Sequence, residues 1–108
     1  MRAVNVLAVF ALACGLGLAQ EKEADVREHF DLVATRATAI FQSAGSIDER
    51  LKDQGATLHP QLAALRMRAD VAIRAARAAL DKHDLAAAES ALKRAEALLD
   101  RFASRLGG

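Results

Sequence analysis

The sequence predicts an all-α protein, either a three-helix up-down-up bundle or a long helical hairpin with coiled-coil-like seams. Apolar residues recur in alternating steps of three and four along most of the chain after residue 20, which is the pattern of helices that pack lengthwise on a partner. The single proline, Pro60, ends the stretch from Gly55 that is the clearest loop signal in the chain. Both glycine and proline are otherwise sparse in the periodic stretches, which favours long helices.

The first segment, residues 1–19, has the build of a secretory signal peptide. Arg2 gives it a short basic start, residues 3–13 are apolar except for Asn5, and small residues follow. The apolar run is shorter than the roughly 20 residues that a membrane-spanning helix needs. We therefore expect the segment to be removed during export, and residues 20–108 to form one alanine-rich helical domain in the periplasm or outside the cell.

Two cleavage sites are compatible with this segment. Gly17 and Ala19 supply the small residues that precede a cut before Gln20. The stretch from Phe10 to Cys14 also resembles a bacterial lipobox, although Ala11 stands where leucine is usual. The first site predicts a free domain, which we favour, and the second predicts a lipid on Cys14 that attaches the helices to a membrane.

The composition of the domain after Ala19 excludes several functions. Removing Arg2 from the 15 basic residues leaves 14, against 14 acidic residues, so the basic excess of a nucleic-acid-binding protein is missing. Cys14 is the only cysteine, so the domain has no disulfide and no thiol nucleophile. Tryptophan and tyrosine are absent, which argues against stacking sites for nucleobases or sugars.

The first helix is expected over residues 21–53. Gly45 interrupts its pattern, and Ser46 to Glu49 has the form of a capping box, so we expect either a kink near Gly45 or a second helix that begins there. The apolar seam keeps its phase across the glycine, which favours a kinked or continuous helix. The seam consists of Val26, Phe30, Val33, Ala37, Ile40, Ala44, Ile47 and Leu51.

Two more helices are expected over residues 60–82 and 85–106. Pro60 suits the first turn of one helix, and Asp84 suits the N-cap of the next. The step of five from Leu80 to Leu85 breaks the apolar phase, which predicts a turn at Asp81–Asp84, but one long helix from Pro60 to Leu106 stays open. The expected seams are Leu62, Leu65, Ala69, Ile73, Ala76 and Leu80, and then Leu85, Ala88, Leu92, Ala95, Leu99, Phe102 and Leu106.

Around this turn the small Ala78, the Asp84 cap, and Ala88 and Ala95 stand at characteristic positions, with His83 and Leu85 in place of a glycine and an aromatic residue. On these residues the stretch Ala78–Ala95 resembles a single hairpin of the tetratricopeptide repeat family. The resemblance implies a tight antiparallel helix pair and a protein-contact role. It occurs once, whereas repeat arrays need about three units. In general style the chain is similar to small exported helical proteins of bacteria.

Metal and catalytic sites are not indicated. The three histidines, His29, His59 and His83, have no helical ligand spacing, and zinc usually takes three or four converging ligands. We expect His29 to be solvated beside acidic neighbours, His59 to lie in a loop and His83 in a turn. No serine has the context of an activated nucleophile, so we expect no metal, no cofactor and no enzymatic activity.

The most regular polar feature is a basic face on the second helix. Arg66, Arg74 and Arg77 lie along one side, with Asp70 between them. They form either a docking face for an acidic partner or anionic lipid, or a solvated face whose charges pair with each other at i,i+4 spacing. Together these features predict an exported interaction or scaffold module that binds itself or another envelope protein. The alternative is a periplasmic carrier of a small ligand or metal.

Overall fold

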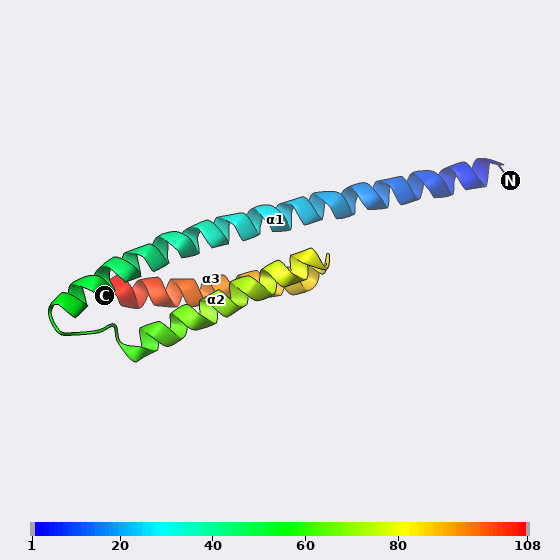
Figure 1. Ribbon diagram of the computed structural model, residues 1–108. Helices are drawn as coiled ribbons and strands as arrows, with labels where there is room; N and C mark the ends of the chain where they lie inside the picture. The colour runs from blue at the N-terminus through cyan, green and yellow to red at the C-terminus, as the bar shows by residue number, and fades with distance from the viewer. Residues whose placement is uncertain (1, 108) are drawn as a thin grey trace.

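Three helices make up the fold of the computed structural model: α1 (Arg2–Asp53), α2 (Pro60–Asp81) and α3 (Leu85–Gly107). The structure describes the backbone of residues 2–107 and the side chains of residues 20–107. The helices run up, down and up, with α1 and α3 parallel and α2 antiparallel to both (Figure 1). The predicted all-α bundle is therefore confirmed. The predicted signal segment, with Cys14, lies outside the residues whose side chains are described.

The helix α1 is longer than expected and unbroken. It begins at Arg2 rather than near residue 21, because its backbone stays helical through the apolar N-terminal run. It also passes Gly45 without a break, and its ribbon curves gradually there (Figure 1). The capping-box interpretation of Ser46 is wrong, since its hydroxyl donates a hydrogen bond of 3.3 Å to the carbonyl of Gln42, four residues back, within the helix.

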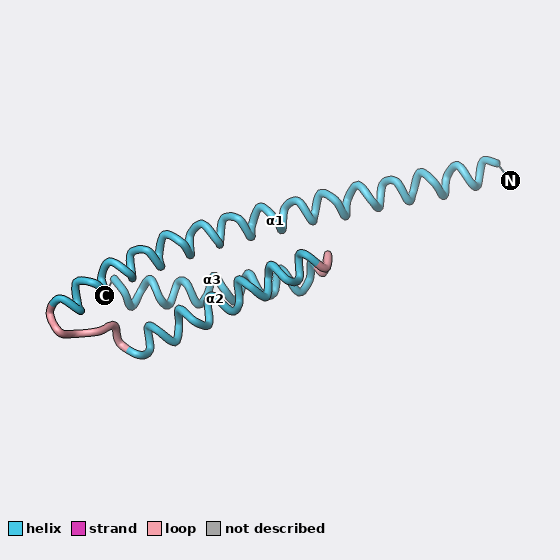
Figure 2. Tube along the Cα trace, in the orientation of Figure 1, coloured by secondary structure: helices cyan, strands magenta, loops and turns pink. Residues whose placement is uncertain are grey.

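The first connection is the expected loop at Gly55–Pro60 (Figure 2). Gly55 has φ of +76°, a conformation that glycine adopts at little cost. The amide of Ala56 donates a 2.7 Å hydrogen bond to the carbonyl of Leu51, which closes the end of α1. On the far side of the loop, His59 caps α2, since its Nδ1 accepts a 3.1 Å hydrogen bond from the amide of Gln61.

The second connection is a tight turn at residues 82–84, so α2 and α3 are not one long helix (Figure 2). His83 has φ of +59° and is the one non-glycine residue with positive φ in the described chain. Asp84 caps α3 as expected, because its carboxylate accepts a 3.1 Å hydrogen bond from the amide of Ala87. The turn makes α2 and α3 an antiparallel hairpin.

The core lies between the hairpin and α1. All residues of the three predicted seams are buried or half-buried, and Leu92, Leu99 and Phe102 are the largest fully buried side chains. Small residues let the helices approach closely, and Ala44, Ala69, Ala76, Ala88 and Ala95 are completely buried. Where α1 meets α3, the rings of Phe41 and Phe102 pack edge to face with centroids 5.9 Å apart, a favoured geometry for aromatic pairs.

Candidate functional site

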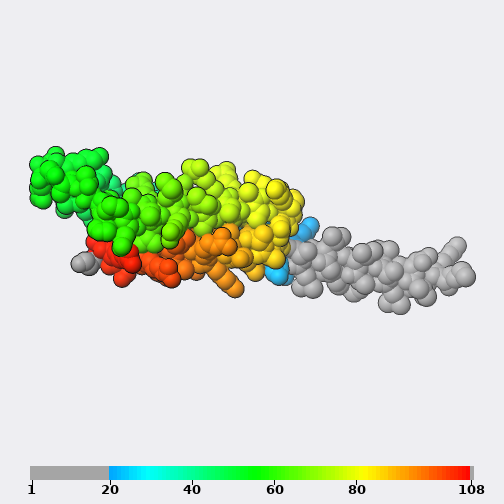
Figure 3. Space-filling view, turned by 90° about the horizontal axis from the view of Figure 1, so that it is seen from below, coloured from blue at the N-terminus to red at the C-terminus, as the bar shows by residue number. Residues whose placement is uncertain are grey.

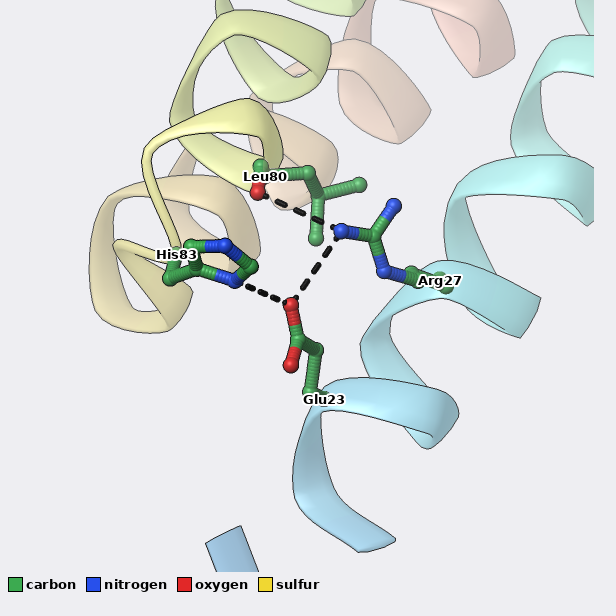
Figure 4. A network of polar contacts seen from close by, with 4 residues as sticks. All are labelled: Glu23, Arg27, Leu80 and His83. Atoms are coloured by element: carbon green, nitrogen blue, oxygen red, sulfur yellow. Dashed lines mark hydrogen bonds and ion pairs between the residues drawn. The ribbon is translucent and has the colours of Figure 1, made fainter. Parts of the chain in front are cut away.

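Polar contacts hold α1 against the turn of the hairpin. The Nδ1 of His83 lies 2.6 Å from the Oε1 of Glu23, and the guanidinium of Arg27 lies 3.1 Å from the same oxygen (Figure 4). Arg27 also reaches the carbonyl of Leu80, at 3.5 Å, which is one of the last carbonyls of α2. These hydrogen bonds, that from His83 first and that from Arg27 next, hold the pKa of the Glu23 carboxyl below its usual range. The contacts fix where α1 meets the turn.

Two more polar contacts join α1 to α3 along its length. His29 contacts the carboxylate of Glu96, and Arg36 contacts that of Asp100. Their side chains are between 39 and 65% exposed, and exposed pairs of this kind contribute at most about 1 kcal/mol each. Their main effect is therefore on the register between α1 and α3.

The histidines are structural in this arrangement. His29 was expected to be solvated, but it lies half-buried against Glu96, because the helix packing brings α3 beside it. His59 is a helix cap, and His83 forms the turn. Within residues 20–107, no group of three or more histidine, cysteine, aspartate or glutamate side chains is placed to hold a metal ion.

The basic face predicted on α2 does not form one uniform surface. The guanidinium of Arg66 lies 5.0 Å from the ring centroid of Phe41 on α1, a cation–π contact. Arg74 is exposed and pairs with Asp70 at 3.1 Å, which is the predicted i,i+4 pairing. Arg77 is exposed near the turn, beside Arg27 and Asp31 of α1. The three arginines thus have three different surroundings.

A surface that the sequence did not single out lies on the side of the hairpin that faces away from α1. Figure 3 shows this side, with α2 (green to yellow) and α3 (orange to red) lying next to each other. Between them runs a shallow groove of about 420 Å³, and none of its lining residues belongs to α1. The lining is Met67, Arg68, Val71, Ala72, Ala75, Arg94 and Leu98.

The groove has an apolar wall and a basic rim. Met67 is 70% exposed and Val71 is 60% exposed, two of the three large apolar side chains that stand out in the described chain. Arg68 and Arg94 supply the charge from α2 and α3, and no acidic residue lines the groove. The sequence signal was present, since Met67 and Val71 are four apart and lie off the predicted seam, but a second apolar stripe on a helix is easily taken for part of its core face.

Comparison with known proteins adds no assignment: no known family matches the chain, and no curated protein or solved structure is significantly similar to it. In the part of the chain with described side chains, no helix combines the length and the apolar character required for a membrane span.

Proposed function

We propose that this chain is a non-catalytic interaction module of the cell envelope, which binds an amphipathic helix in the groove between α2 and α3. The observation that carries the proposal is the pair of exposed apolar residues, Met67 and Val71, beside a groove with a basic rim. Exposed apolar residues that gather around a groove are typical of interaction sites, and helix-in-groove binding uses apolar anchors in this arrangement. The signal-peptide pattern of residues 1–19 supports the envelope as its location.

The basic rim specifies the charge of the partner helix. Arg68 and Arg94 favour a helix whose apolar stripe is flanked by carboxylates, since opposite charges steer association and fix register. Two grooves facing each other would bring arginine against arginine, so a symmetric contact between identical grooves is disfavoured. The partner therefore presents a different surface to the groove.

The outer face of α1 offers carboxylates and one exposed apolar anchor for this groove. Glu21, Asp25, Glu28 and Leu32 follow one another in steps of four, three and four, so they share one face of the helix, and all four are exposed. Leu32 is the third large exposed apolar residue, at 65%. We therefore propose that the groove of one copy receives the outer face of α1 from a second copy. Because the two surfaces differ, this association is head-to-tail.

Sedimentation velocity over a concentration series at low salt tests this self-association. We expect reversible association of the wild-type protein that weakens as salt rises. Val71→Asp changes the groove and Leu32→Asp changes the α1 face, and each should make the protein monomeric. Thr38→Asp is the matched control, because it adds the same charge to an exposed position of α1 away from Leu32, and it should sediment as wild type.

If the wild-type protein is monomeric, the partner of the groove is another envelope protein rather than a second copy. A photoreactive residue at Val71 should then give a specific adduct in the intact envelope, and the same residue at Thr38 should not. The proposal would be overturned if the protein is monomeric and the adducts from Val71 and Thr38 do not differ.

A further inference from the structure

A second concave site lies beside α2, where residues of α1, the loop and α2 line a cleft that shares Met67 with the groove. It is a cleft of about 640 Å³, within the range of about 300–1,000 Å³ that small-ligand sites occupy. Phe102 of α3 forms its floor, because this residue lines the cleft but is fully buried. Phe41, Leu58, Leu62 and Met67 supply the apolar walls from α1, the loop and α2.

The shape of the connection explains why the cleft is open. Gly55 ends α1 in a left-handed conformation, and the chain then runs on to the His59 cap before α2 begins. Thr57 and Leu58 therefore border the cleft between the two helices. The small side chain of Ala63 on α2 leaves room beside them. The cleft is bounded by α1, the loop and α2, with Phe102 of α3 at its floor, which suits an apolar tail rather than a helix that runs through it.

One positive charge at the cleft lacks an acidic partner. Four charged residues line the cleft, and Lys52 pairs with Asp48 at 3.3 Å while Asp70 pairs with Arg74 at 3.1 Å. The fourth is Arg66, and no carboxylate within residues 20–107 pairs with it. Its guanidinium lies 5.0 Å from the ring centroid of Phe41, so its charge is held beside an apolar wall.

We infer that this cleft binds a small anionic amphiphile, with the apolar tail on Phe41, Leu62 and Phe102 and a carboxylate on Arg66. A planar guanidinium presents N–H donors in a fork that matches a carboxylate, and no carboxylate of residues 20–107 pairs with these donors in Arg66. This ligand site adjoins the proposed helix-binding groove and shares Met67 with it, but the inference does not depend on that proposal.

Calorimetric titration with decanoate tests the inference, at concentrations below those at which decanoate forms micelles. We expect one decanoate per chain, weaker binding of 1-decanol, which has the same tail without the charge, and no heat from acetate. Arg66→Gln should weaken decanoate binding by about tenfold or more, since it removes a hydrogen bond between charged groups, and should leave 1-decanol binding unchanged. Arg77→Gln is the matched control, because Arg77 is an exposed arginine of the same helix and does not line the cleft.

A second variant tests the location of the tail. Ala63→Phe fills the cleft from an exposed position, so the fold, followed by far-UV circular dichroism, should be kept while binding of both decanoate and 1-decanol is lost. The inference is overturned if wild type binds no decanoate, if Arg66→Gln and Arg77→Gln bind it equally, or if Ala63→Phe binds as wild type.

Discussion

His83 occupies a backbone conformation that suits glycine, and replacing it measures what that conformation costs. Its φ of +59° lies in the left-handed region, where a residue with a Cβ atom is destabilised by about 1–2 kcal/mol. Glycine avoids this strain but makes the unfolded chain more flexible, which lowers the free energy of unfolding by about 0.4–1 kcal/mol. His83→Gly should therefore be more stable than His83→Ala by about 0.5–1 kcal/mol.

The comparison of the two variants isolates the backbone. Both lose the contact of His83 with Glu23, so that loss cancels in the difference. Urea unfolding followed by far-UV circular dichroism measures the free energy of unfolding of each. Equal stabilities, or a more stable alanine variant, would refute the assignment of strain at this turn. In the tetratricopeptide hairpin that this turn resembles, glycine is usual at the position of His83. A more stable glycine variant would agree with that preference.

Three further predictions concern stability. Gly45→Ala should stabilise the protein by about 0.5–1 kcal/mol, because Gly45 is inside α1 and no atom lies near an added Cβ. Gly55→Ala should destabilise the protein, because the φ of Gly55 is +76°. Urea unfolding of both variants checks that the free energy of unfolding changes in opposite directions. Leu92→Ala should cost about 2–5 kcal/mol, since Leu92 is fully buried, and a loss no larger than that of the exposed Leu32→Ala would contradict the core assignment. The lowered pKa of Glu23 means that its carboxylate stabilises the fold above the usual glutamate range and that this contribution is lost as the pH falls through the lowered pKa. Glu23→Gln should therefore be less stable than wild type near neutral pH, and urea unfolding over a pH series should show the difference shrinking as the pH falls below the usual glutamate range. A difference that does not change with pH would count against the contacts of Glu23 with His83 and Arg27.

The helices and their core faces could be predicted because they depend on local periodicity. The seam from Val26 to Leu51 and the phase break between Leu80 and Leu85 correspond to the buried face of α1 and to the turn. The buried faces of α2 and α3 are broader than the predicted seams, since Ala72, Ala91 and Leu98 are also buried. A helix packed on two neighbours buries a broader face than a two-helix seam does.

The contacts between helices could not be predicted, because they join residues that are far apart in the chain. His29 and Glu96 are 67 residues apart, and Glu23 and His83 are 60 apart. Nothing in the local sequence of either partner points to the other. The same holds for Arg66, which the sequence places on a face with Asp70 and Arg74 but which lies over Phe41 of α1. The capping box at Ser46 is wrong for a different reason, since the apolar seam stays in phase across Gly45, with Ala44 buried before it and Ile47 half-buried after it.

The hairpin of α2 and α3 and the helix α1 differ in how their contacts are distributed along the chain, and this sets an order of folding. The hairpin closes through the short turn at residues 82–84, so little chain entropy is lost when its two helices meet. The polar contacts from α1 to α3 close loops of more than 60 residues, and they require α3 to be complete. We therefore expect the hairpin to form before α1 docks, since α1 has no finished surface to pack on until α2 and α3 have met.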